Sequence, residues 1–253
     1  MSTSKGSKLN LLLQNIPKGS VILAFWLSRQ GYSHDLQQKY IQSHWLEPIG
    51  RGAFKRSGDE IDIYGAIYAL QKQAEKKIHI GGPSALFLLG YAHYIPMEQR
   101  DLILFTQQGF KLPAWFTTYK WKVGYLIRQT NMLPAEKALT SYPTKSFQIK
   151  ISTAPRAMLE CLELSPKNFD LEEAWFIMEG LNALQPGLVQ ELLEQCRSIK
   201  AKRLFLFLAD KAGHSWFKYL DISKIQLGKG KRSIVNKGVL IHKYQITIPE
   251  NLK

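Results

Sequence analysis

The pattern of apolar and polar positions is most informative between residues 20 and 56. Apolar residues at helical spacing run from Val21 to Gln30, and Gly31 follows them as a residue that commonly ends a helix. Ser33 can then cap a second helix that runs to about Ser43. Two short helices joined by a tight turn that contains glycine predict a helix-turn-helix.

The residues that follow this motif predict a basic β-hairpin. Residues 45–49 and 53–56 can pair as strands, with Gly50-Arg51-Gly52 as the turn between them. Helix, turn, helix and basic hairpin together predict a winged helix-turn-helix, a module that mostly binds DNA. Arg51, Lys55 and Arg56 would place positive charge where a wing meets DNA phosphates.

The second helix has two faces when each residue is advanced by about 100°. Leu36, Tyr40 and Ile41 fall on the side that must pack against the first helix. The candidate DNA-contacting residues lie on the opposite side, on the flanks and at the helix start: Ser33, His34, Gln37, Gln38, Lys39 and Gln42. Glutamine suits adenine edges in the major groove, and lysine suits guanine or phosphate. A polar face is also the norm for a solvated amphipathic helix, so both interpretations stay open.

The rest of the chain predicts further helices and strands without a repeat. Helices are expected at residues 8–15, 61–75, 83–89, 156–164, 171–181, 186–196 and 200–212, with Asp170 as a cap. Strands are expected at 78–80, 101–106, 111–117, 121–129, 147–152, 224–227, 232–235, 239–241 and 244–248, with a turn at 236–238. These elements predict an α+β protein with a winged helix-turn-helix over residues 1–75 and a mixed α/β domain over 76–253.

Composition points to a polyanionic partner. The formal net charge is +14, and the segment from Arg197 to the end holds 13 Lys and Arg against three acids. No apolar run approaches the roughly 20 residues that a membrane span needs, so we expect no membrane partner and no signal peptide. Cys161 and Cys196 lie far apart in the sequence and are expected to be buried free thiols in the cytoplasm.

Candidate catalytic and ligand-binding patterns are weak. No His-x-x-x-His, Asp-x-Asp or Ser/His/Asp signature stands out, so we expect neither an enzyme nor a metal or cofactor. Gly81-Gly82 before Pro83 lacks the features of a phosphate-binding loop, which favours a structural turn. Seven aromatic residues are more typical of core than of a stacking platform for single-stranded nucleic acid: Phe105, Phe110, Trp115, Phe116, Tyr119, Trp121 and Tyr125.

The segment LLLQNIPKGSVILAFWLSRQGYSHDLQQKYIQSHWLEPIGRGAFKR resembles the N-terminal winged-helix domain of AbiEi-type antitoxins. The resemblance extends over most of the chain through IYGAIYALQ, HIGGPSALFLLGYAHY, KLPAWF, RSIKAKRLFLFLADKAGHSWFKYLD and KYQITIP. It implies the antitoxin half of a type IV toxin-antitoxin system for abortive infection against bacteriophage. In similar proteins the N-terminal domain binds inverted repeats in its own promoter and represses it. Their C-terminal domain is needed to neutralise a nucleotidyltransferase-like toxin, generally without a stable complex.

The resemblance implies duplex DNA and such a toxin as partners. Because a single winged helix reads only a short site, we expect two copies of the protein on an inverted repeat and a monomer in solution. We expect a surface for neutralisation in the basic C-terminal segment, at Lys200, Lys202, Arg203, Lys229, Lys231 and Arg232. Cations in a first helical turn oppose the helix dipole, so stability does not obviously select the first three. A generic solubilising surface is the competing interpretation. Two other classes of function stay open: a ligand-responsive transcription factor and a nucleic-acid-processing enzyme.

Overall fold

The computed structural model describes residues 5–91, 101–236 and 238–253. They form two compact units that each combine segments distant in sequence. Unit 1 draws on residues 1–79, 109–125 and 141–150, and unit 2 on residues 80–108, 126–140 and 151–253. The expected boundary after residue 75 stays a prediction about which part of the chain folds and binds DNA by itself.

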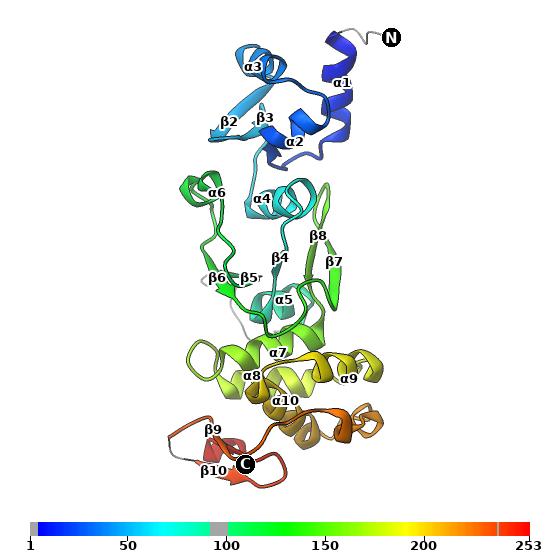
Figure 1. The fold of residues 1–253 in the computed structure, drawn as a ribbon, viewed down its shortest axis with the longest axis vertical. Helices are drawn as coiled ribbons and strands as arrows, with labels where there is room; N and C mark the ends of the chain where they lie inside the picture. The colour runs from blue at the N-terminus through cyan, green and yellow to red at the C-terminus, as the bar shows by residue number, and fades with distance from the viewer. Residues whose placement is uncertain (1–4, 92–100, 237) are drawn as a thin grey trace. The chain divides into compact units, whose positions relative to one another are not determined.

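Unit 1 begins with the winged helix-turn-helix (Figure 1). Its elements in chain order are α1 (Lys5–Asn15), β1 (Ile22–Leu23), α2 (Ala24–Arg29), α3 (His34–Gln42), β2 (Leu46–Gly50) and β3 (Ala53–Arg56). The three strands form an antiparallel sheet in the order β1-β3-β2. The first helix of the motif begins at Ala24 and not at Val21. Ile22 and Leu23 are extended instead, because they pair with Phe54 and Ala53.

An apolar cluster lies inside this motif and fixes the position of its helices. Its buried members come from α1, the motif helices and the sheet: Leu12, Ile16, Ile22, Leu27, Tyr40, Leu46 and Phe54. Leu36 and Ile41 are partly buried and pack against the same cluster. The predicted inner face of α3 is therefore confirmed.

The helix after the wing changes its hydrogen-bonding pattern part-way. It was expected at residues 61–75; α4 spans Ile63–Tyr68, with Asp62 as its cap, and the chain continues as a π-helix, η1, over Ala69–Gln73. The Gln73 amide is buried and bonds one edge of the extended segment at β1, accepting from Leu23 N and donating to Val21 O, both at 2.8 Å. Gln73 thus takes the place of a neighbouring strand along β1.

A five-stranded sheet has the order β6-β5-β4-β8-β7. Its strands are β4 (Ile78–Ile80), β5 (Leu102–Thr106), β6 (Tyr125–Gln129), β7 (Leu139–Pro143) and β8 (Gln148–Ser152). The predicted strand at residues 111–117 was wrong, because this segment holds the helix α6 (Ala114–Thr118). Pro113 is the N-cap, so the aromatic residues that suggested a strand follow a helix start. Strand β7 falls between the strands expected at residues 121–129 and 147–152, where no helix or strand was expected.

The start of α5 (Gly82–Leu88) confirms the structural turn expected at Gly81-Gly82. The buried Glu160 carboxylate accepts the Gly82 N–H at 2.9 Å and the Ser152 hydroxyl at 2.7 Å. Its other oxygen accepts from Arg156 Nε at 2.8 Å. An internal carboxylate therefore occupies the place at this helix start that an anionic ligand would take.

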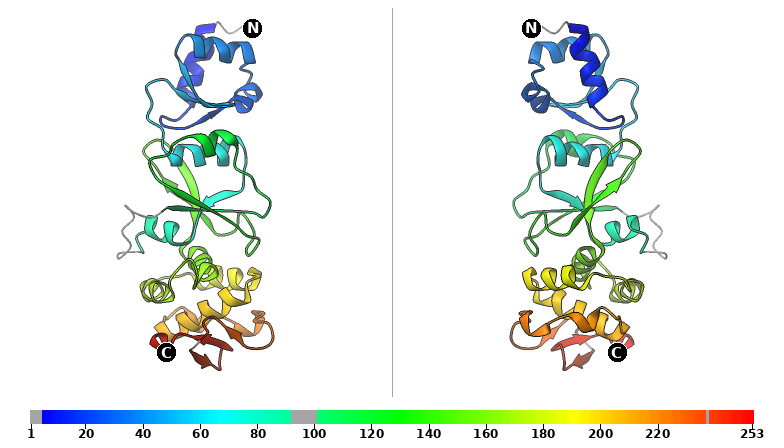
Figure 2. Two further views of the ribbon diagram at one scale, coloured as in Figure 1. Left: turned by 90° about the vertical axis from the view of Figure 1, so that its left-hand side faces the viewer. Right: turned by 90° about the vertical axis from the view of Figure 1, so that its right-hand side faces the viewer.

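Unit 2 contains four longer helices and a small sheet (Figures 1 and 2). The helices are α7 (Ala154–Leu164), α8 (Leu171–Gly180), α9 (Pro186–Gln195) and α10 (Ile199–Ala212), and Asp170 caps α8 as predicted. Strands β9 (Arg232–Ser233), β10 (Val239–Ile241) and β11 (Ile246–Ile248) form a sheet in the order β10-β11-β9. The described residues of unit 2 also form the short 3-10 helices η3 (Phe217–Tyr219), η4 (Ile222–Lys224) and η5 (Glu250–Leu252).

Two details of the C-terminal segment differ from the sequence pattern or fall outside it. The strand expected at residues 224–227 was wrong, because η4 ends there and Asp221 bonds the Ser223 N–H at its start. The turn expected at residues 236–238 includes Lys237, which lies outside the described residues. Both cysteines are free and buried, as predicted, and burial raises the pKa of the Cys196 thiol to about 11.

Membrane-spanning helices and clusters of metal-ligating side chains are both absent from residues 5–91, 101–236 and 238–253. Within them, no helix is both long enough and apolar enough to cross a membrane. The same residues contain no group of three His, Cys, Asp or Glu side chains that could hold a metal ion.

Candidate nucleic-acid interface

The turn between α2 and α3 presents α3 to solvent. Gly31 has a φ of +84°, in the left-handed region that suits glycine, and lets the chain leave α2 sharply. Ser33 Oγ accepts the Leu36 N–H at 3.4 Å and caps α3, as the sequence predicted. The apolar side of α3 is held by the cluster described above, so its polar side faces outward.

The outward face of α3 carries most of the predicted base-contacting side chains. His34, Gln38, Lys39 and Gln42 are exposed, and Ser33 is exposed at the helix start. Gln38 Nε2 and His34 Nε2 are 3.5 Å apart, one helical turn from each other. These exposed side chains can therefore contact a binding partner without a rearrangement of the fold.

Gln37 does not belong to this outward face. Its side chain is only 2% exposed, and its Nε2 lies within hydrogen-bond distance of Tyr32 O at 2.8 Å and Ser28 Oγ at 3.0 Å. A third acceptor is Ala24 O at 3.2 Å. The expectation that Gln37 contacts DNA is corrected, because its amide joins α3 to α2 and to the turn.

The wing carries fewer available cations than the sequence suggested. Lys55 is paired across the hairpin with Glu47 at 3.0 Å and donates to Asp59 O at 3.1 Å. The hydrogen bond from Lys55 lowers the pKa of the Glu47 carboxyl. Lys55 is therefore partly neutralised within the hairpin.

Arg56 binds the end of α1. Its Nη2 donates to Leu13 O and, at 2.9 Å, to Ile16 O. Carbonyls at a helix C-terminus lack partners within the helix and favour a nearby cation. Arg56 therefore fastens the wing to α1. Arg51, at the hairpin turn, is the exposed cation of the predicted wing triad.

The predicted C-terminal basic surface, like the wing, contains some cations that bind groups inside the protein and others that are exposed. Arg203 is 2% exposed and binds backbone carbonyls of the chain that follows η4. Its Nε donates to Leu227 O at 2.8 Å, and its Nη1 donates to Gly230 O at 2.7 Å and Gln245 O at 2.8 Å. The guanidinium is thus an internal support for the loop, and the expectation of a surface role is corrected.

The other two cations at the start of α10 are also used inside unit 2. Lys200 Nζ donates to Ser165 O at 2.8 Å and to Glu163 O, at the C-terminal end of α7. The positive charge there complements the dipole of α7, which explains a cation that opposes the dipole of α10. Lys202 is 2% exposed, and burial lowers the pKa of its ammonium.

The exposed part of the predicted surface is the loop at residues 228–232. Lys229, Lys231 and Arg232 are all exposed. Gly228 and Gly230, with φ values of +68° and +76°, shape the loop around the Arg203 guanidinium. We call Lys229, Lys231 and Arg232 the loop cations.

Matches to protein families cover nearly the whole chain. Residues 5–97 match the N-terminal domain of the AbiEi antitoxin transcriptional regulators, and residues 99–249 match the AbiEi antitoxin transcriptional regulator of type IV toxin-antitoxin systems. The chain belongs to the AbiEi antitoxin family. No curated protein matches this chain.

A solved structure supports the fold of this AbiEi-family chain. The RV2827C protein from Mycobacterium tuberculosis has a similar fold, with a TM-score of 0.59 and 16% sequence identity. The match covers 94% of this chain and 89% of the mycobacterial chain. The α+β class with an N-terminal winged helix-turn-helix is therefore confirmed.

Several aromatic residues of the AbiEi chain are core, as the sequence favoured. Phe105, Trp115 and Phe116 are buried. The centroid of the Phe116 ring lies 5.4 Å from that of Trp121 and 5.1 Å from that of Tyr125. These contacts leave the three buried rings unavailable for stacking on bases.

Sequence reasoning did not find the polar side chains that organise the two units. Gln73, Glu160 and Arg203 all bond backbone groups or side chains far away in the sequence. The residue type alone does not show whether a glutamine or arginine on a helix is buried or exposed to solvent. Only the contrast between a cationic helix start and the dipole of α10 marked Arg203 as unusual.

Proposed function

We propose that the winged helix binds duplex DNA with α3 in the major groove. The observation that carries this proposal is the exposure of Gln38 and Gln42 on a helix whose other face is fixed by the apolar cluster. Their amides suit adenine edges, and Lys39 suits guanine or phosphate. Ser33 and His34 lie at the helix start, from which recognition helices commonly contact DNA. Arg51 contacts phosphate from the wing.

Membership of a family of transcriptional regulators supports a regulatory role for this binding. We propose that two copies bind inverted repeats in the promoter of the protein's own operon and repress it. One α3 reads only a short site, and the spacing of two half-sites adds specificity. The protein is proposed to be a monomer in solution that pairs on the DNA.

Footprinting tests this proposal with the full chain on DNA from upstream of its own gene. We expect protection of two half-sites about one helical turn apart, or a multiple of it. Fluorescence anisotropy should give an affinity that falls as salt rises and exceeds the affinity for scrambled DNA of the same length. Equal affinity for both sequences, or protection of a single half-site at saturation, contradicts the proposal.

We further propose that unit 2 neutralises a nucleotidyltransferase-like toxin through the loop cations. Support comes from their exposure and from Arg203, which holds the loop in place from inside. The target is an anionic surface, either an acidic region of the toxin or its nucleic-acid substrate. No stable complex between the two proteins is expected.

Co-expression with the product of the adjacent gene tests this half of the proposal. That gene should encode a nucleotidyltransferase-like protein that stops growth, and the full chain should restore growth. A neighbour of unrelated type would favour a ligand-responsive transcription factor instead. Growth that stays arrested in the presence of folded antitoxin contradicts the proposal.

A further inference from the structure

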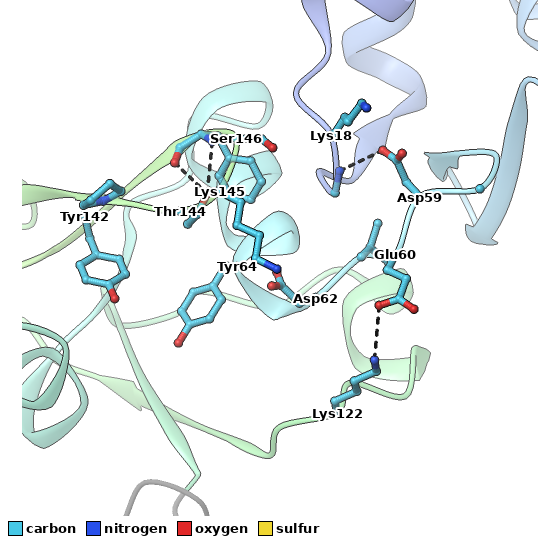
Figure 3. A pocket seen from close by; sticks show the side chains of 15 residues that line it. Lys18, Asp59, Glu60, Asp62, Tyr64, Lys122, Tyr142, Thr144, Lys145 and Ser146 are labelled. Carbon is cyan, nitrogen blue, oxygen red and sulfur yellow. Dashed lines mark hydrogen bonds and ion pairs between the residues drawn. The ribbon is translucent and has the colours of Figure 1, made fainter.

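Unit 1 contains a hollow of about 770 Å³ that is lined by none of the proposed DNA-contacting residues (Figure 3). Three segments of unit 1 form most of its wall: residues 18–19 between α1 and β1, residues 58–64 at the start of α4, and residues 142–147 between β7 and β8. The volume falls in the range of about 300–1,000 Å³ that is typical of small-molecule sites.

Two tyrosine rings provide the flat part of this hollow. Tyr64 projects from α4 and Tyr142 from β7, and Figure 3 shows their hydroxyls turned the same way. Burial raises the pKa of Tyr64, and the nearby Tyr142 raises it further, which agrees with two rings close together. Tyrosine faces are apolar and polarisable, so they suit the face of a planar ring.

Lys145 provides an available positive charge. It is exposed on the turn between β7 and β8, and Figure 3 shows its ammonium extended into the hollow. In the described part of the chain, Lys145 has no hydrogen-bond or ion-pair partner. A ligand that carries phosphate can therefore bind this ammonium without breaking a contact of the fold.

The three carboxylates of the hollow already have partners. Asp59 accepts the Gly19 N–H at 2.9 Å, and Asp62 accepts the Gly65 N–H at 3.0 Å as the cap of α4. Glu60 pairs with Lys122 at 3.7 Å. These contacts reduce the repulsion that a ligand anion would meet. Each carboxylate keeps lone pairs that can accept from hydroxyl groups.

We propose that this hollow binds a free mononucleotide. The base lies against the rings of Tyr64 and Tyr142, the phosphate binds the Lys145 ammonium, and the ribose hydroxyls donate to the carboxylates. A purely apolar ligand would leave the charged groups unused, and a bare anion would leave the tyrosine faces unused. The proposal is independent of DNA binding by α3 and can be tested without DNA.

Isothermal titration of the full chain tests the proposal with the four nucleoside 5′-monophosphates, the matching nucleosides and inorganic phosphate. At least one nucleotide should bind with 1:1 stoichiometry, and more tightly than its nucleoside or phosphate. Lys145→Gln should weaken nucleotide binding about tenfold and leave nucleoside binding unchanged. Tyr142→Ala should weaken both at least about fivefold, whereas Tyr142→Phe should retain most of the affinity because it keeps the ring.

Lys120→Gln is the matched control, because Lys120 is an exposed lysine of unit 1 outside the hollow. It should bind nucleotide like the parent, and circular dichroism should show all variants folded. The proposal is overturned if no mononucleotide binds at millimolar concentration or if Lys145→Gln binds like the parent. Binding of single-stranded oligonucleotides without binding of mononucleotides also overturns it.

Discussion

At the scale of single residues, two adjacent glutamines of α3 have different roles, one inside the fold and one on the surface. The Gln37 amide is buried against α2 and the turn, whereas the Gln38 amide is exposed beside His34. A rotation of about 100° along the helix separates the two side chains. The local pattern placed Gln37 on a flank, and its burial depends on where α2 lies.

This contrast predicts different effects for substitutions of the two glutamines. Gln37→Leu should lower the free energy of unfolding by about 1–3 kcal/mol, because Tyr32 O in the turn loses its donor at 2.8 Å. Gln38→Ala should leave stability nearly unchanged and reduce discrimination between operator and random DNA by about 1–3 kcal/mol if the contact is bidentate. Urea unfolding and anisotropy measure the two quantities. Unchanged discrimination in Gln38→Ala, and likewise in Gln42→Ala, contradicts the assignment of this face.

The two arginines of the wing provide a second matched pair. Arg51→Ala should weaken binding to operator and random DNA alike and leave the melting temperature unchanged. The slope of the logarithm of the binding constant against the logarithm of salt concentration should become shallower by about one, as expected for the loss of one phosphate contact. Arg56→Ala should lower stability by about 1–3 kcal/mol, because the carbonyls of Leu13 and Ile16 lose a charged donor. Thermal melting and a salt titration separate the effects. A stable Arg56→Ala that loses only DNA affinity would show that Arg56 acts on phosphate after all.

At the scale of elements, the π-helical segment η1 provides two side-chain amides that bond strands of two different β-sheets. Gln73 bonds β1, and two residues earlier Gln71 donates to Ile78 O at 2.8 Å and accepts from Lys150 N at 2.8 Å. Both side chains therefore act where a strand would otherwise pair. π-helical turns are rare and often have a specific task, which here is to supply these two amides.

Removal of one of these amides should destabilise the winged helix. Gln73→Leu keeps a similar volume and leaves Val21 O and Leu23 N without their partner, at a cost of about 1–3 kcal/mol for each group. Hydrogen exchange should show faster exchange of the Leu23 amide than in the parent. Lys72→Leu, on the same segment, is the control. Equal protection of Leu23 in Gln73→Leu and the parent would contradict the role of this amide.

The basic loop of unit 2 should separate neutralisation from repression. Lys229→Gln, Lys231→Gln and Arg232→Gln in one protein should keep the fold and promoter repression but fail to rescue cells that express the toxin. The same change at the exposed Lys167, Lys218 and Lys224 removes equal charge elsewhere in unit 2 and should still rescue. Rescue by the loop variant would assign the loop cations a solubilising role.

Substitution of all six predicted cations would not test this idea. Lys202 and Arg203 are buried, and Arg203 supports the loop itself, so their loss should unfold this part of unit 2. An unfolded antitoxin fails to rescue for reasons unrelated to its surface. The loop variant avoids this ambiguity because its three side chains are exposed.

At the scale of the whole molecule, a fragment of residues 1–75 should fold and bind DNA. The apolar cluster of the winged helix lies within residues 12–54, and Gln73 is retained. The fragment loses Trp115, whose Cβ lies 2.8 Å from the position that a Cβ on Gly50 would take, so it should melt below the full chain. Circular dichroism and anisotropy measure folding and salt-sensitive binding.

A shorter fragment is the control for this prediction. Residues 1–56 keep the apolar cluster but lack Gln73, so Val21 O and Leu23 N lose their buried partner. We expect this fragment to be less stable than residues 1–75. A folded 1–75 fragment that binds DNA no more tightly at low salt than at high salt would contradict the assignment of the DNA-binding part.

By itself the sequence determined the features that depend on neighbouring residues. Capping by Ser33 and Asp170, the helix end at Gly31 and the hairpin around Gly52 follow from local backbone chemistry and were predicted. The apolar face of α3 follows from helical periodicity, because every residue on it packs in one direction. The type of module was therefore readable before any tertiary contact was known.

Only the tertiary structure decided the task of each polar side chain. Arg203 binds carbonyls 24 to 42 residues away, Arg56 binds carbonyls 40 and 43 residues away, and Glu160 binds an amide 78 residues away. A charge is identical in sequence whether it meets water, DNA or a buried carbonyl. The difference arises because burial requires that a polar group find its partner inside the protein, and the fold alone places that partner.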